Sequence, residues 1–199
     1  MAKTPDGQLI VNPSAESLAS AAAQATRKGP PPVHLWNPPF CGDLDMEIRR
    51  DGTWFYQGTP IGRKPLVRLF SGILKREGEK FFLVTPVEKV GIRVEDAPFV
   101  AVDAEAEGAG RGQRLTFATN VEDRVTAGPS HPIRMARDPE TGEPSPYVHV
   151  RAGLEALIDR KTFYRLAELG LHERHEGQDW FGLWSDGAFF PLVPSAEMA

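Results

Sequence analysis

The sequence predicts an α+β protein with two pseudo-repeated halves, each made of antiparallel strands packed on one helix. Three observations lead to this fold class. An amphipathic helix pattern begins near Pro65, a series of short alternating strands follows it as far as Asn120, and a strand–turn–helix order with the same basic opening occurs at Arg63 and again at Arg160. Together they indicate helices and sheets that alternate along the chain in two comparable blocks.

Composition narrows the classes of function. The chain has 199 residues and a net charge of -4, so duplex nucleic acid is not an expected partner, because that affinity comes largely from neutralising phosphates. The single cysteine, Cys41, permits no internal disulfide and suits a reducing compartment. We find no secretory signal pattern and no apolar run of membrane-spanning length. A cytoplasmic protein without a membrane partner is therefore expected.

The first of three expected parts, residues 1–32, consists of a helix and a stiff linker. Asn12 and Pro13 suit a helix start, and the alanine-rich helix is expected to run over 13–28, before a proline-rich linker. Leu18 is its only large aliphatic residue, so the docking face is small. We expect this helix to rest on the main body, with a detached arm as the alternative.

The second part, residues 33–120, forms the N-terminal α+β half. An ordered loop is expected at 33–45, then a strand at 46–50, a hairpin turn at Asp51-Gly52, and a strand at 53–57 that residues 58–60 end. The next helix is expected to continue until Gly78. It places Leu66, Leu69, Phe70, Ile73 and Leu74 on one face, where each contributes about 1.5–3 kcal/mol when buried. Four further strands, at 80–85, 87–94, 98–105 and 113–120, should form an antiparallel meander.

The third part, residues 121–199, forms the C-terminal half. Strands are expected at 129–136 and 146–152, whereas 153–158 fits either a helix or a strand. Asp159 is a good cap for a helix over 160–169, and Gly170 ends it. His172 and His175 follow that end, so we expect a solvated loop there rather than a zinc site. The sequence closes with DWFGLWS, a turn at Asp186-Gly187, and AFFPL.

An internal echo links the two halves. The first helix opens with RKPLVRL at 63–69 and the second with RKTFYRL at 160–166, each after a strand and a turn. Few residues are identical, so chance is an open alternative, but the repeated order favours duplication.

A longer set of segments resembles a known family, the bacterial domain-of-unknown-function 1285 family. The resemblance covers residues 33–191 and rests on WNPPFCGDLDMEIRRDGTWFYQGTPIGRKPLVRLF, TPVEKVGIRVEDAPF and YVHVRAGLEALIDRKTFYRL. It implies a duplicated α+β core whose C-terminal half is loosely similar to pleckstrin-homology-like folds. It also implies a nucleotide-like ligand between the halves and a role in signalling. It supplies no catalytic residues.

Basic residues at the helix starts are the best candidates for a ligand site. Cations near a helix N-terminus are unfavourable by about 0.3–1 kcal/mol unless something compensates them. An anion bound by the free backbone N–H groups would do so, and Thr59 and Gly62 would allow it a close approach. The candidate cations are Arg63, Lys64, Arg160 and Lys161, with Arg68 and Arg165 one turn further along. The alternative is pairing with nearby carboxylates, such as that of Asp159.

An aromatic residue could complete such a site. Trp36 could stack on a base, and Asn37 or Asp43 could read its edge. The alternative is that the loop around them fills the seam between the halves.

The preferred function is a non-enzymatic ligand-binding or sensor protein for a phosphate-bearing, nucleotide-like molecule, with no cofactor or metal. One alternative is a hydrolase that uses Asp43, Asp45 or Glu88, which requires carboxylates clustered in one cleft with raised pKa values. The other is a protein-interaction module that uses sheet edges or the alanine-rich helix. Cys41 would need a neighbouring base, and His34 is the nearest in sequence.

Overall fold

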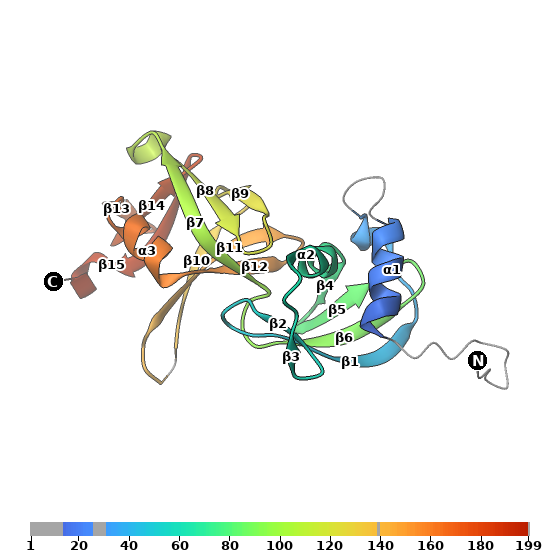
Figure 1. Ribbon diagram of the computed structural model, residues 1–199. Helices are drawn as coiled ribbons and strands as arrows, with labels where there is room; N and C mark the ends of the chain where they lie inside the picture. The colour runs from blue at the N-terminus through green and yellow to red at the C-terminus, as the bar shows by residue number, and fades with distance from the viewer. Residues whose placement is uncertain (1–13, 26–30, 139, 199) are drawn as a thin grey trace, which may run out of the picture. The chain divides into compact units, whose positions relative to one another are not determined.

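The computed structural model describes residues 14–25, 31–138 and 140–198 and divides the chain into two compact units, Met1–Glu95 and Asp96–Ala199. The units are described separately (Figure 1). The division lies earlier than the boundary expected at 120/121. The strands on either side of it read as one meander in the sequence, but they belong to different sheets.

Unit 1 contains a six-stranded sheet in the order β3-β2-β1-β6-β5-β4. Its strands are β1 (Phe40–Ile48), β2 (Trp54–Tyr56), β3 (Thr59–Pro60), β4 (Leu74–Glu77), β5 (Lys80–Val84) and β6 (Lys89–Val94). β1 and β6 are parallel and the other pairs are antiparallel. The expectation of purely antiparallel strands is therefore wrong, because the long path between β1 and β6 leaves room for a crossover.

The start of β1 also corrects a prediction. Residues 33–45 were expected to form an ordered loop, but they contain the short 3₁₀ turn η1 (Val33–Leu35) and the first part of β1. Phe40 and Asp43 pair with Lys89 and Gly91 of β6, with shifts in register between them. The tryptophan, prolines and glycine of this segment resemble a loop, and only the distant partner strand makes it extended.

Of the expected apolar residues, Phe70 is the one that lies in the helix α2 (Lys64–Gly72) and is buried. Phe70 is fully buried, and its ring stacks on Trp54 of β2 with 6.3 Å between centroids. The helix ends at Gly72 rather than near Gly78, since Leu74 already belongs to β4 and pairs with Leu83. Leu66 and Leu69 are only half-buried. Leu74 fits the apolar face of a helix, but its pairing with Leu83 makes it the first residue of a strand.

The alanine-rich helix is present as α1 (Ala15–Ala25), and its expected cap at Asn12 and Pro13 lies outside the described residues. Ala15, Leu18 and Ala22 are buried, and α1 packs on α2. The helix therefore rests on unit 1, as expected.

Unit 2 contains a second six-stranded sheet, in the order β10-β11-β12-β7-β8-β9, and a separate three-stranded sheet, β13-β14-β15. The strands of the larger sheet are β7 (Phe99–Glu107), β8 (Arg114–Thr119), β9 (Arg124–Thr126), β10 (Ile133–Arg137), β11 (Pro144–Arg151) and β12 (Leu154–Ile158). β12 and β7 are parallel. The ambiguous segment 153–158 is thus a strand, with its turn at Gly153.

The rest of unit 2 comprises α3 (Arg160–Ala167), β13 (Leu171–His175), β14 (Gln178–Ser185), β15 (Ala188–Pro194) and two 3₁₀ turns, η2 (Gly110–Gly112) and η3 (Ser195–Met198). The solvated loop expected around His172 and His175 is strand β13, which pairs with β14. β13 lies at the edge of a small sheet, so many of its side chains are exposed and charged. In the sequence such a segment resembles a solvated loop.

The two-half α+β architecture is confirmed: each unit has a six-stranded sheet and a helix near it, and sheet predominates. The echoed segments occupy different places in the two sheets. In unit 1 the first strand of the hairpin, β1, lies beside the parallel neighbour β6, whereas in unit 2 the second strand, β12, lies beside β7. α2 follows the extra strand β3, whereas α3 follows β12 directly.

Candidate functional site

The start of α2 exposes two neighbouring cations, Arg63 and Lys64. Arg63 is the N-cap residue, in an extended conformation, and no side chain caps the helix. Among the residues that the structure describes, neither Arg63 nor Lys64 forms an ion pair, and both are exposed. Thr59 lies just before them on β3 and is exposed, and Arg68 lies one helical turn further on. These four residues form what we call the α2 basic cluster.

The backbone contributes little to this cluster. The N–H groups of Leu66 and Val67 both donate to the carbonyl oxygen of Arg63, at 3.0 and 3.2 Å. Pro65 has no N–H to offer. The side chains of the α2 basic cluster must therefore supply most of the binding to any anion.

The second basic pair has a different environment. The carboxylate of Asp159 caps α3 by accepting the N–H of Thr162 at 2.7 Å. The guanidinium of Arg160 donates to Glu143 at 2.7 Å. Arg165 pairs with Asp103 and holds the pKa of that carboxyl below its ordinary value, mainly by hydrogen bonding. Lys161 is exposed beside them. Arg160 and Arg165 therefore pair with carboxylates, which was the alternative to binding an anion.

Trp36 and Asn37 lie at the other side of the unit 1 sheet. Trp36 is half-buried, and its carbonyl oxygen accepts a hydrogen bond from Lys75 Nζ of β4 at 3.4 Å. Asn37 is exposed. β4 and β3 are opposite edges of the sheet, about five inter-strand spacings or roughly 24 Å apart. The structure therefore does not bring Trp36 together with Thr59 and the α2 basic cluster.

The carboxylates of the hydrolase alternative are not clustered in one cleft. Asp43 and Asp45 lie on the exposed face of β1, and only Asp43 lines the neighbouring groove. Glu88 lies in the turn between β5 and β6, where it is 4% exposed and its Oε2 has no hydrogen-bond partner. Burial raises the pKa of Glu88. Asp43, Asp45 and Glu88 therefore do not form the cluster that the hydrolase alternative requires.

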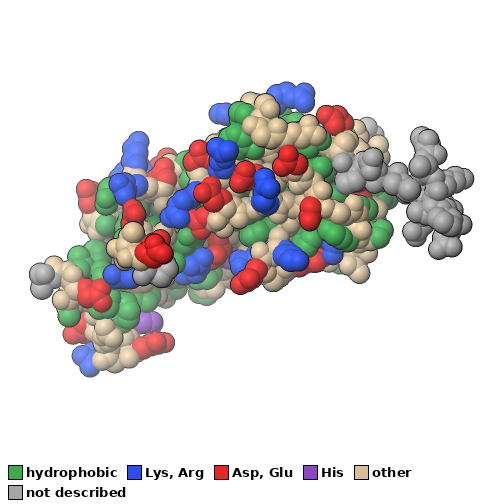
Figure 2. Space-filling model, turned by 90° about the horizontal axis from the view of Figure 1, so that it is seen from below, with side chains coloured by type: hydrophobic (Ala, Val, Ile, Leu, Met, Phe, Trp, Pro, Cys, Tyr) green, Lys and Arg blue, Asp and Glu red, His purple; other side chains and the backbone are tan. Residues whose placement is uncertain are grey.

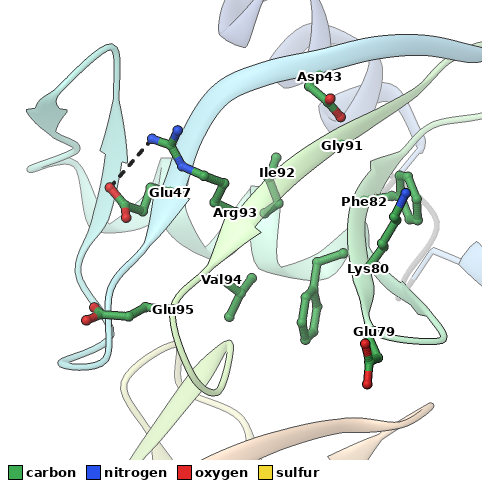
Figure 3. Close-up of a pocket in the computed structure, with 11 residues that line it drawn as sticks. Asp43, Glu47, Glu79, Lys80, Phe82, Gly91, Ile92, Arg93, Val94 and Glu95 are labelled. Carbon is green, nitrogen blue, oxygen red and sulfur yellow. Dashed lines mark ion pairs between the residues drawn. The ribbon is translucent and has the colours of Figure 1, made fainter.

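The groove beside Asp43 is a feature that sequence reasoning missed. It has a volume of about 440 Å³ and lies over β1, β5 and β6 (Figure 3). Arg93 in this groove pairs with Asp45 and Glu47, at 3.5 and 3.8 Å. Gly91 has no side chain here, and a Cβ on it would overlap Asp43 Oδ1. Acidic residues at every second position of β1 were the available sequence signal for an exposed strand face.

Charges of both signs are interspersed on one face of the molecule (Figure 2). On the face that Figure 2 shows, Lys and Arg side chains lie among Asp and Glu side chains, without a large field of one sign. Within the described part of the chain, no group of three or more His, Cys, Asp or Glu residues could hold a metal ion, and no helix is long and apolar enough to cross a membrane. Cys41 is half-buried, and its thiol contacts the carbonyl oxygen of Pro39.

Comparisons with known proteins agree with the family resemblance. Residues 31–97 match the model described as the N-terminal domain of unknown function (DUF1285), and residues 98–192 match the model of the DUF1285 C-terminal domain. No curated protein matches the chain.

Two solved structures are similar. A DUF1285 family protein from Silicibacter pomeroyi DSS-3 is 68% identical, with a TM-score of 0.83, over 91% of this chain and 97% of that one. A DUF1285 family protein from Shewanella baltica OS155 is 28% identical, with a TM-score of 0.50, over 63% of this chain and 91% of that one. The boundary between the two family models agrees with the division between the two units. The chain therefore belongs to the DUF1285 family.

Proposed function

We propose that this protein is a ligand-binding or sensor protein, and that the α2 basic cluster holds the phosphate of a nucleotide-like small molecule. The observation that carries the proposal is the pair of exposed cations, Arg63 and Lys64, which form no ion pair among the described residues and stand at a helix start without a capping side chain. An uncompensated cation at this position costs about 0.3–1 kcal/mol, and a bound anion would remove that cost.

The side chains of the α2 basic cluster determine how it would contact a phosphate. Arg63 can grip two phosphate oxygens with its planar guanidinium, while Lys64 adds a point charge and Thr59 a hydroxyl. Arg68 lies four residues after Lys64, on the same side of the helix. Trp36 is too distant to stack on the same small molecule, so base recognition is not assigned to it. Arg160 and Lys161, the other predicted contacts, are left out of this assignment.

The family resemblance supplies the remaining parts of the proposal. It implies the nucleotide-like ligand, the signalling role and the pleckstrin-homology-like character of the C-terminal half, and these stay predictions, as does the cytoplasmic location.

The test is calorimetry and thermal shift against inorganic phosphate, pyrophosphate and nucleoside mono-, di- and triphosphates. We expect saturable binding of at least one compound. The double substitution Arg63→Ala and Lys64→Ala should weaken it roughly tenfold to hundredfold, since charge-assisted hydrogen bonds contribute about 1.5–3 kcal/mol.

The matched control is Arg160→Ala with Lys161→Ala, which removes the same residue types from the start of the other helix and should leave binding unchanged. Absence of binding by every phosphate compound, or equal loss in the two double variants, would overturn the proposal.

A further inference from the structure

An apolar groove in unit 2 has no role in the function proposed above. It has a volume of about 530 Å³ and lies between β10 and β15, an edge strand of each of the two sheets. Six apolar residues line it: Ile133, Met135, Trp180, Pro191, Leu192 and Pro194. Arg134, Arg137 and Glu197 are its charged residues. The groove thus combines an apolar lining with two guanidinium groups.

The two arginines differ in how firmly they are held. Arg134 donates two hydrogen bonds to Glu155, at 2.6 and 2.8 Å, and its guanidinium lies 4.2 Å from the centre of the Tyr147 ring. Hydrogen bonding to Glu155 also raises the pKa of Arg134. Among the described residues, Arg137 pairs only with Glu197 of η3, at 2.7 Å, and the two side chains are 49% and 51% exposed. Both arginine side chains are equally exposed, but exposed ion pairs are weak, so Arg137 exchanges its partner more readily than Arg134.

We propose that this groove binds a small carboxylate that carries an apolar body. The ligand carboxylate replaces that of Glu197 on Arg137, so one ion pair is exchanged for another of the same kind. The apolar body lies against Met135, Trp180 and Pro191, which are half-buried, and removes their remaining surface from water. Glu197, on the last turn of the chain, acts as an internal stand-in for the ligand carboxylate.

The composition of β15 favours such a molecule over an extended peptide. Pro191 and Pro194 both lie on this edge strand, and neither has a backbone N–H to donate to an added strand. Strand addition would therefore lose donors at two positions, whereas an apolar body needs none. The groove depends on residues of unit 2 alone, so its test is independent of the α2 basic cluster.

The experiment titrates octanoate into the full-length protein, with tryptophan fluorescence and calorimetry as readouts. We expect saturable binding and a change in fluorescence from Trp180. Arg137→Gln should weaken octanoate binding roughly tenfold, because the charge-assisted contact is lost. Glu197→Gln should tighten it, because the competing carboxylate is gone.

Two controls separate this site from general apolar binding. Octanol has the same apolar body without the carboxylate and should bind at least tenfold more weakly than octanoate. Arg114→Gln alters an exposed arginine of unit 2 that does not line the groove, and it should leave octanoate binding unchanged. The proposal fails if octanoate shows no saturable binding, if octanol binds equally well, or if Arg137→Gln binds octanoate as the unaltered protein does.

Discussion

The helices α2 and α3 open with the same Arg-Lys pair and differ in the residues around it. α3 is preceded by Asp159, which caps the helix through the N–H of Thr162, and Arg160 pairs with Glu143. α2 has Arg63 itself at the capping position, with no capping side chain and no ion pair within the described part of the chain. One motif therefore gives a compensated helix start in unit 2 and an uncompensated one in unit 1.

This difference teaches that a basic motif at a helix start does not define a site by itself. The residue before the motif decides whether the dipole is already balanced, and carboxylates from other elements decide whether the cations are engaged. Only the first of these is visible in the sequence. Glu143 and Asp103, which engage Arg160 and Arg165, are far from them along the chain.

The largest expected effect is on the packing that stabilises α2. Without a capping side chain, α2 depends on packing, and Phe70→Ala removes a fully buried ring that stacks on Trp54. We expect the free energy of unfolding of unit 1 to fall by about 3–5 kcal/mol. Hydrogen exchange of 64–72 in increasing denaturant measures it, and the amides of α3 serve as the internal control. A loss below about 1 kcal/mol would show that α2 is not held by this contact.

The second prediction is that Glu88 in unit 1 and Asp103 in unit 2 make the stability of their units depend on pH in opposite directions. Burial raises the pKa of Glu88 in unit 1, so the folded state binds more protons than the unfolded state above the ordinary value of 4.5, and unit 1 loses stability as pH rises through this range. Hydrogen bonding to Arg165 lowers the pKa of Asp103 in unit 2, so that contribution is lost as pH falls instead.

Glu88→Gln tests the sign. It should flatten the fall in unit 1 stability above pH 4.5 and leave the pH response of unit 2 unchanged, as followed by hydrogen exchange of each unit from pH 4 to pH 8. If the pH response of unit 1 is unaltered in this variant, Glu88 is not the cause of the fall in stability.

Local signals predicted those parts of the fold that local chemistry determines. The hairpin at Asp51-Gly52 forms as expected, because Gly52 supplies a positive φ of 81° and the Asp51 carboxylate accepts the N–H of Thr53. The start of α3 at Asp159 is equally local, since the cap and its partner are three residues apart. The two-half architecture followed from the order of such elements.

Pairing between distant strands determined the rest. Leu74 fits the apolar face of a helix but pairs with Leu83 in a sheet, and the parallel partners of β1 and β12 cannot be read from either strand alone. The candidate site shows the same limit. The sequence identified Arg63 and Lys64 as unusual. It could not show that Trp36 lies at the opposite edge of the sheet from them.

The third prediction concerns the capping positions: a carboxylate is removed from the start of α3 and another is introduced at the start of α2. Asp159→Ala should destabilise α3 by about 1 kcal/mol, because the N–H of Thr162 loses its acceptor. Arg63→Asp should stabilise α2 by up to about 1 kcal/mol, because a carboxylate replaces a cation at the helix start, where the helix dipole favours negative charge. Hydrogen exchange of each helix measures both effects. The comparison between the helices fails if Arg63→Asp destabilises α2.

The smallest expected effect belongs to Arg160. Its ion pair with Glu143 joins side chains that are 74% and 60% exposed, and such pairs contribute about 0–1 kcal/mol. Arg160→Ala should therefore change the unfolding free energy of unit 2 by less than about 1 kcal/mol, and high salt should remove the difference, because exposed charges are screened. A double-mutant cycle with Glu143→Ala isolates the pair. A coupling well above 1 kcal/mol would mean that Arg160 is a structural residue, and it would deepen the contrast with Arg63, whose charge has no such partner among the described residues.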